Sequence, residues 1–269
     1  MKFSSRGFPK RNMSTLSLTT HFIRREIGNR YLGSFSGGLW ALLQPLLQLA
    51  VYGFVWTYVF GMRVPGGPDA PGIVAFLAMG VWPWNAFAEA VTRATTSIQD
   101  NSALIGKIAL PRQILVLSSV ASSFLLHGIG FCAIVIVLAI SGTQIHWLGV
   151  PLALAAFAQL FVLALGFAFL FAAVQVFVRD LVQTLTQLMP LWMFAAPVLY
   201  PREFLPEQYR AWLDFNPFTF YPEFLRAQVL GYGHVPVSAA LISAALALLL
   251  FVIGYGVFRR LSAHFEDFL

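Results

Sequence analysis

Six polar and aromatic side chains recur at every fourth position between residues 40 and 60 of this chain. In an α-helix, each is turned by roughly 40° from the one before, so together they form a slowly winding stripe. Amide groups hydrogen-bond to hydroxyls and aromatic rings stack on sugar rings, so the stripe suits a carbohydrate ligand. Interhelical packing with glutamine as a hydrogen-bonding residue is the alternative. The stripe consists of Trp40, Gln44, Gln48, Tyr52, Trp56 and Phe60.

A second group of this type lies in "VWPWNAF", where Trp82, Trp84 and Asn85 come within four residues. We expect these three side chains to line the same glycan channel, near the outer half of a membrane helix. Tryptophan also favours the membrane–water interface for reasons unrelated to a ligand, so interfacial anchoring is the alternative.

Other motifs that support catalysis are absent from the sequence. There is no phosphate-binding loop, because "LIGKIAL" has Lys107 after a single glycine. The five histidines show no metal-ligand spacing, and the one cysteine, Cys132, excludes a cysteine metal cluster within the chain. Glu89 and Arg93 are four residues apart, so they can form a local salt bridge on one helix face; a role in transport is the alternative. We therefore predict no catalytic residue and no metal or cofactor in this chain.

The elements that hold these residues are membrane helices. Of 269 residues, 58% are hydrophobic and 10% are charged, with a mean hydropathy of +0.75, whereas soluble domains contain about 25% charged residues. The basic residues behind the net charge of +6 lie beside apolar segments, which argues against nucleic-acid binding. The fold class predicted is an all-α polytopic membrane protein.

Six apolar segments are long enough to cross a bilayer, which takes about 20 residues. The turn-rich stretches "VPGGPDAPG" and "SGTQIHWLGVP" separate neighbouring segments. An even number of spans places both termini on one side. Of the basic residues, 13 fall on the side of the termini and 4 on the other, so the positive-inside rule makes both termini cytoplasmic. The predicted spans are 39–62, 71–88, 114–140, 150–178, 181–201 and 235–258.

The inside loop at 93–113 contains the helix-capping residues Asp100, Asn101 and Ser102. They predict a short helix over 102–109, ended by Pro111. This helix would present apolar residues in a cytoplasmic loop, so it either lies on lipid headgroups or docks on a partner protein. Its candidate contact residues are Leu104, Ile105, Lys107, Ile108, Pro111 and Arg112.

The outside region at 190–233 is rich in proline and aromatic residues. Pro206 and Pro222 predict two short helices over 206–212 and 222–231, the second ended by Gly231. Short helices of this type after a spanning helix suggest re-entrant pieces that form a gate; an aromatic loop resting on the bilayer is the alternative. The candidate gate residues are Pro190, Pro197, Tyr200, Pro201, Trp212 and Phe218.

Four segments in this order resemble a known family: "REIGNRYLGSFSGGLWALLQPLLQ", "LIGKIALPRQILVLSS", "RDLVQTLTQLMPLWMFAAPVLYP" and "NPFTFYPEFLRAQVLG". From about Leu18 to Gly233 the chain is similar to the membrane subunit of type-2 ABC exporters of O-antigen, capsular or teichoic-acid polysaccharide. Gly37 and Gly38 depart from the family's pattern, and would loosen the hinge into the first span.

The resemblance implies a homodimeric permease of the bacterial inner membrane, in which a lipid-linked (polyprenyl-diphosphate) glycan passes through a channel at the dimer interface. A separate ABC ATPase, with two copies per complex, binds ATP and Mg²⁺, and the helix near 102–112 is the coupling helix seated in it. Helices between the fifth and sixth spans form the outer gate.

The resemblance also implies an amphipathic helix over 14–36 that lies on the cytoplasmic membrane face and contacts the ATPase. Its polar residues are Arg24, Arg25, Glu26 and Arg30. The remaining predicted boundaries are an N-terminal segment at 1–13, the transmembrane domain at 37–258 and a cytoplasmic tail at 259–269.

Two other functions fit parts of the sequence. A type-2 exporter of small drugs or lipids would share the coupling features, and the aromatic stripe argues against it. A membrane enzyme acting on polyprenyl lipids would need clustered carboxylates or histidines at the membrane face, where Glu89, Asp100 and Asp180 form no such cluster.

Overall fold

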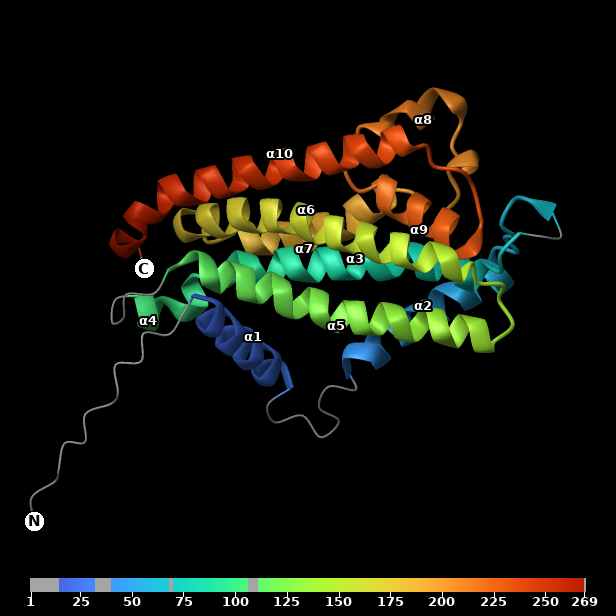
Figure 1. The fold of residues 1–269 in the computed structure, drawn as a ribbon. Coiled ribbons are helices and arrows are strands. Elements are labelled where there is room, and N and C mark those ends of the chain that lie inside the picture. The colour runs from blue at the N-terminus through green and yellow to red at the C-terminus, as the bar shows by residue number, and fades with distance from the viewer. Residues whose placement is uncertain (1–14, 32–39, 68–69, 106–110, 269) are drawn as a thin grey trace, which may run out of the picture.

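Helices account for the secondary structure of the computed structural model, which describes residues 15–31, 40–67, 70–105 and 111–268 (Figure 1). Within these ranges there are ten α-helices and no strand, in agreement with the predicted fold class. The α-helices are α1 (Thr15–Tyr31), α2 (Trp40–Phe54), α3 (Ile73–Thr96), α4 (Ser102–Ile105), α5 (Gln113–Ile140), α6 (Val150–Phe177), α7 (Leu181–Ala195), α8 (Glu207–Asp214), α9 (Phe220–Leu230) and α10 (Val237–Leu261). Shorter helical turns are η2 (Val55–Val59), η4 (Gln99–Asn101), η5 (Trp147–Gly149), η6 (Arg202–Phe204) and η7 (Ser262–Asp267).

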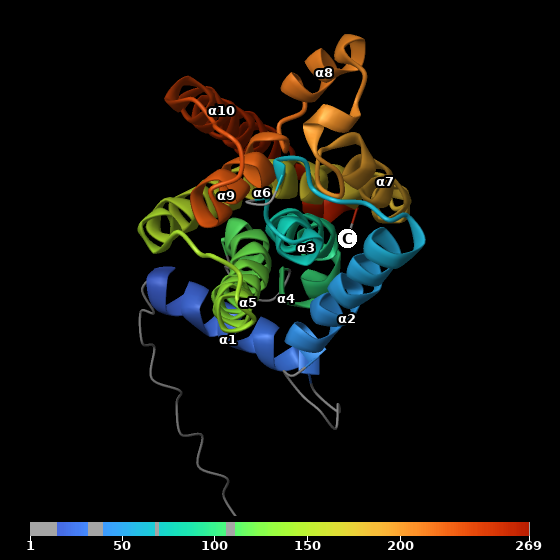
Figure 2. The same cartoon turned by 90° about the vertical axis from the view of Figure 1, so that its right-hand side faces the viewer.

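Helix α3 forms the centre of the bundle. Viewed end-on, it lies among α2, α5, α6, α7 and α9 (Figure 2), and it packs against each of them. Its residues Phe76, Leu77, Ala78 and Met79 are fully buried. An apolar helix that is covered on all sides is a core helix, so residues on α3 can face several neighbouring helices at once.

Four helices are long and apolar enough to cross a membrane: α3, α5, α6 with the preceding η5, and α10 with the following η7. They correspond to the second, third, fourth and sixth predicted spans. Helix α3 continues past the predicted end at Ala88 to Thr96, because Glu89 and Arg93 pair with each other within the helix.

The helices at the first and fifth predicted spans are shorter than expected. Helix α7 has 15 residues, about 22 Å at 1.5 Å per residue, against a hydrocarbon thickness of about 30 Å. It stops because Ala196 precedes Pro197, and a residue before proline is driven into the extended region, where Ala196 lies at φ −114° and ψ 154°. Helix α2 passes at Val55 into the wider π-turn η2, and Gly61, at φ 60°, ends this segment.

Helix α10 lies at the edge of the bundle and packs along α6. Gly254 of α10 approaches Gly166 of α6 so closely that a methyl group on Gly254 would lie 2.0 Å from the Gly166 carbonyl oxygen. Small residues allow this close approach of two backbones, as is common between membrane helices. The other face of α10 exposes Leu241, Ile242 and Leu249, which suits contact with lipid.

The short helices gather at the two ends of the bundle (Figure 1). Helices α8 and α9 lie at one end, and α4 and η7 lie at the other, where α1 also packs on α5. The predicted helix after Pro206 is α8, and Gly231, at φ 65°, ends α9 as predicted. The expected helix at 102–109 begins at Ser102 as α4; residues 106–110 lie outside the described part of the chain.

Candidate functional site

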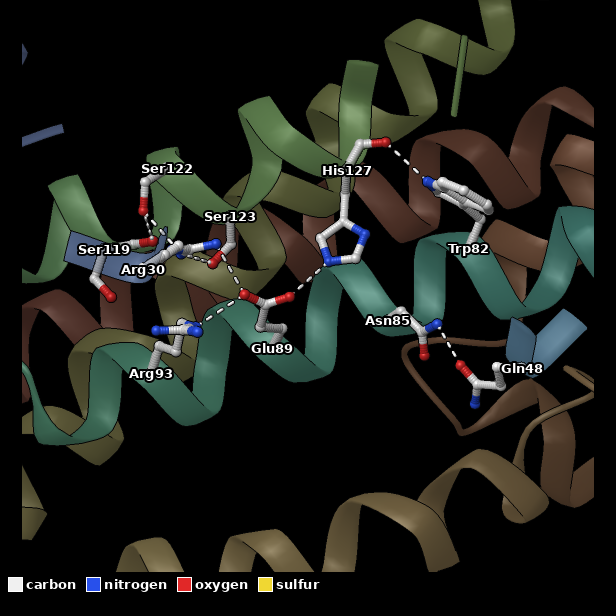
Figure 3. A network of polar contacts seen from close by, with 10 residues as sticks. All are labelled: Arg30, Gln48, Trp82, Asn85, Glu89, Arg93, Ser119, Ser122, Ser123 and His127. Atoms are coloured by element: carbon white, nitrogen blue, oxygen red, sulfur yellow. Dashed lines mark hydrogen bonds and ion pairs between the residues drawn. The ribbon is translucent and has the colours of Figure 1, made fainter. Parts of the chain in front are cut away.

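Glu89 is the centre of a polar network between α1, α3 and α5 (Figure 3). Its Oε1 accepts hydrogen bonds from Arg30 Nη1 and from Arg93 Nε, each at 2.8 Å, and its Oε2 lies 2.8 Å from His127 Nε2. Both carboxylate oxygens are therefore occupied. The predicted Glu89–Arg93 salt bridge is confirmed, and the structure adds two partners from distant parts of the chain.

The side chain of Arg30 is only 3% exposed. Besides Glu89, its Nη2 donates to Ser122 Oγ at 2.9 Å and to Ser123 Oγ at 2.6 Å, both on α5 (Figure 3). A buried arginine is stable only when its charge is paired and its donors are satisfied. These contacts fix the C-terminal end of α1 to the transmembrane bundle.

Amide side chains extend the network from α3 to α2. Asn85 Nδ2 donates to Gln48 Oε1 at 2.8 Å, and Gln48 Nε2 donates to the Tyr52 hydroxyl at 3.2 Å. One turn of helix separates Asn85 from Glu89, so the amide and charged groups share one face of α3. Together they form a polar surface within an otherwise apolar bundle.

This surface lines a cleft of about 760 Å³ between α1, α2, α3 and α5. Ligand pockets in proteins typically enclose about 300–1,000 Å³, so the cleft is large enough for a sizeable ligand. Its lining residues are Arg30, Trp40, Gln44, Pro45, Gln48, Asn85, Ala88, Glu89, Arg93, Leu126 and His127.

Only part of the predicted stripe on α2 lines this cleft. Trp40, Gln44 and Gln48 line it, as does Asn85 on α3. Tyr52 does not line the cleft, but its hydroxyl accepts a hydrogen bond from Gln48, which does. Further along, the Trp56 and Phe60 rings pack on each other with centroids 5.4 Å apart, and neither lines the cleft.

Trp82 and Trp84 do not reach the cleft, because both are buried in the core, at 2% and 3% exposure. Trp82 Nε1 donates to the His127 carbonyl oxygen at 2.9 Å (Figure 3). Trp84 packs edge-on against Phe218, with ring centroids 4.8 Å apart. In this arrangement the two rings stabilise helix packing, and no glycan could contact them.

The residues expected at the ATPase contact are only partly described. Leu104 is half-buried, Ile105 is 8% exposed and Pro111 is exposed, while Lys107 and Ile108 lie outside the described residues. Arg112 donates to the Ser262 carbonyl oxygen and pairs with Glu266, so it joins this loop to η7.

On α1, the polar residues point in different directions. Arg24 is exposed and Glu26 is half-buried. Arg25 donates to Asn101 Oδ1 in η4 and lies over the Phe22 ring, 4.4 Å from its centroid. Hydrogen bonds thus join α1 to η4 through Arg25 and to α3 and α5 through Arg30. Gly37 and Gly38, the glycines expected to loosen the hinge, lie outside the described residues.

The expected gate residues differ in exposure. Pro190 is exposed on α7 and Trp212 is 76% exposed on α8, while Phe218 is fully buried. Pro197 and Pro201 are buried in the segment after α7, where the Tyr200 hydroxyl donates to the Phe194 carbonyl oxygen at 2.8 Å.

The sequence interpretation missed Arg226 of α9. It is 2% exposed, and it donates to the carbonyl oxygens of Pro197 and Val198 at 2.6 Å each and to that of Phe76 at 3.2 Å. It therefore bonds the segment after α7 to α3. His127, Ser122 and Ser123 were also missed; a histidine inside a charge-free helix was the one signal available for them.

Comparison with known proteins extends these observations. The family model described as "ABC-2 type transporter" matches residues 18–230. The O-antigen export system permease protein RfbA of Myxococcus xanthus is 32% identical over 185 residues, which cover 68% of each chain. A protein of the same name from Klebsiella pneumoniae is 26% identical over 256 residues, 91% of this chain and 92% of that protein.

The polysialic acid transport protein KpsM of Escherichia coli is 24% identical over 258 residues, 94% of this chain and 95% of that protein. The relatives from Klebsiella pneumoniae and Escherichia coli match more than nine tenths of the chain, and the family model covers all helices from α2 to α9. The chain belongs to the ABC-2 type transporter family.

Proposed function

We propose that this chain is the membrane subunit of an ATP-driven exporter of lipid-linked polysaccharide. The observation that carries the proposal is the match to permeases named for O-antigen export and polysialic acid transport, which extends over more than nine tenths of the chain. The cleft supports it, because Trp40, Gln44, Gln48 and Asn85 offer an aromatic face and amide groups, the groups that suit a carbohydrate.

The chain crosses the bacterial inner membrane six times in this proposal. Helix α2 with η2, and α7 with the segment after it, supply the first and fifth spans beside the four longer helices. Both termini face the cytoplasm, in keeping with the 13 basic residues on that side against 4 on the other. The placement of α4 and η7 at one end, and of α8 and α9 at the other, agrees with this orientation (Figure 1).

A second copy of the chain and two copies of an ABC ATPase complete the complex. ATP and Mg²⁺ bind to the ATPase, and the loop that begins with α4 docks on it. The Arg25–Asn101 and Arg112–Glu266 contacts join this loop to α1 and to η7, so a displacement of the loop would be passed to both. Helices α8 and α9 form the outer gate, with Arg226 bonding the segment after α7 to α3.

Channel formation requires a surface for the second copy. Helix α2 exposes Leu47, Val51 and Phe54, and α7 exposes Leu188, Leu191 and Phe194. Exposed apolar faces within a membrane chain contact either lipid or another protein surface. We assign the α2 face to the channel side because it adjoins the polar cleft.

The test is the ATPase rate of the complex, purified with its ATPase subunit in lipid nanodiscs, with and without a polyprenyl-diphosphate-linked glycan. We expect stimulation by the glycan. Trp40→Ala should raise the glycan concentration needed for half-maximal stimulation roughly fivefold, because an aromatic contact contributes about 1 kcal/mol. Trp147→Ala is the matched control, since Trp147 is exposed and lies outside the cleft.

Stimulation by small amphiphiles, without any response to the glycan, would contradict the proposal. It would identify the chain as a drug or lipid exporter of the same family, and would reduce the stripe on α2 to a packing feature.

A further inference from the structure

The polar cleft contains hydrogen-bond donors that the protein itself does not use. Glu89 is the one acidic residue among those that line the cleft, and its two oxygens are taken by Arg30, Arg93 and His127. Two arginines and one carboxylate line the cleft, so its lining carries more positive than negative charge. An anion entering it would therefore find its charge compensated.

Arg93 is the principal free donor. Its Nε is bound to Glu89, whereas its two terminal nitrogens have no hydrogen-bond partner among the described residues. The side chain is 43% exposed and lines the cleft. A guanidinium presents two parallel N–H groups in a fixed fork, which match a pair of phosphate oxygens.

Gln44 provides a second unused group from the α2 side. Its side chain lines the cleft and makes no hydrogen bond to the described part of the chain. Donors on α3 and on α2 thus face the same space, where they can bind separate oxygens of one ligand. The volume, about 760 Å³, exceeds what a single phosphate group would fill.

The surroundings of the cleft suit a headgroup that carries both a lipid and a sugar. Leu43 and Leu46 are exposed on α2, so a hydrocarbon chain could lie along this helix outside the cleft. Within the cleft, Trp40 offers an aromatic face on which a sugar ring could stack. The phosphate would then contact hydrogen-bond donors, the sugar an aromatic ring and the lipid apolar side chains.

We propose that the cleft binds the diphosphate that joins a polyprenyl carrier to its glycan. The Arg93 fork binds the phosphate oxygens, Gln44 donates to the same group from α2, and Trp40 contacts the first sugar. Glu89 is a positioning residue, because it holds the Arg93 guanidinium through Nε and leaves the two terminal nitrogens directed to the ligand. This inference rests on the proposed function and names the part of the substrate that the cleft recognises.

The experiment measures binding of radiolabelled, sugar-free polyprenyl diphosphate to the full complex in phosphatidylcholine nanodiscs. We expect Arg93→Gln to weaken binding about ten- to hundredfold, the loss expected when hydrogen bonds to a charged group are removed, and Arg93→Lys to restore part of it. Gln44→Ala should weaken binding several-fold. Arg259→Gln is the matched control: Arg259 is exposed at the end of α10 and outside the cleft.

Wild-type affinity in both Arg93→Gln and Gln44→Ala would overturn the assignment. Since the Gln44 side chain has no partner in the described structure, Gln44→Ala tests the site even if Arg93→Gln lowers stability. Equal competition by phosphatidylglycerol would also overturn it, because the cleft would then accept any phosphate headgroup. The failure of the proposed function looks different: glycan would not stimulate the wild-type ATPase, whatever the binding of the sugar-free lipid.

Discussion

At the scale of single residues, Glu89 connects three helices that are far apart in the sequence. Removing its charge while keeping its shape, as in Glu89→Gln, takes from the buried Arg30 guanidinium the carboxylate with which it pairs. Breaking a buried pair costs about 3–5 kcal/mol; since the Glu89 side chain is 35% exposed, we expect about 2–3 kcal/mol. This corresponds to an apparent unfolding temperature roughly 5–10 °C lower, measured on the purified complex.

The control for this prediction is Glu203→Gln, because Glu203 is exposed and its side chain forms no ion pair in the described structure. The double variant Arg30→Gln/Glu89→Gln should lose less than the sum of the single variants, since it removes both members of the pair. Full additivity would show that the two charges do not stabilise each other.

At the scale of elements, the contact between α6 and α10 depends on two glycines. Gly254→Ala would place a methyl group 2.0 Å from the Gly166 carbonyl oxygen, so the helices must separate. Overpacking of this type costs about 1–3 kcal/mol. We expect a lower unfolding temperature and less folded complex in the membrane. Gly256→Ala, two residues away, is the control: a methyl group there meets nothing within 4 Å. Equal behaviour of the two variants would contradict the assigned packing.

Elements set by local patterns could be predicted from the sequence. The long charge-free runs gave α5, α6 and α10, and Pro206 and Gly231 marked an end of α8 and of α9. Helix α7 was predicted six residues too long, because apolar composition extends past it while Pro197 prevents the preceding residue from being helical. Composition records hydrophobicity, and backbone sterics decide where the helix ends.

The polar site could be predicted only in part, because most of its contacts join helices that are distant in the sequence. Glu89 and Arg93 are one turn apart, so their pairing follows from the helix alone. Their partners Arg30 and His127 are 59 and 38 residues from Glu89, and their approach depends on how α1 and α5 pack on α3. Trp82 and Trp84 illustrate the converse, because a tryptophan on a central helix is buried by neighbours that its local sequence does not reveal.

At the scale of the whole molecule, short helices lie at the two ends of the bundle and a polar cleft lies between its helices. The exposed sides of α5, of α10 and of the C-terminal half of α7 are apolar, with Ile129, Val252 and Leu191 more than half exposed. Such surfaces are stable in lipid and would aggregate in water. A membrane therefore has to surround the bundle and leave α8 at one surface and η7 at the other.

Cysteine labelling tests this placement directly. In a Cys132→Ala background, which removes the native cysteine, single cysteines are introduced as Gln208→Cys in α8 and His264→Cys in η7, both at exposed positions. A membrane-impermeant maleimide added to spheroplasts should label Gln208→Cys at once and His264→Cys only after permeabilisation, because the proposed orientation places η7 on the cytoplasmic side. The reverse pattern would show that the chain has the opposite orientation in the membrane, with η7 outside and α8 inside. Labelling of both cysteines from outside would place α8 and η7 on one side, which requires an even number of crossings between them and would exclude the six-span topology.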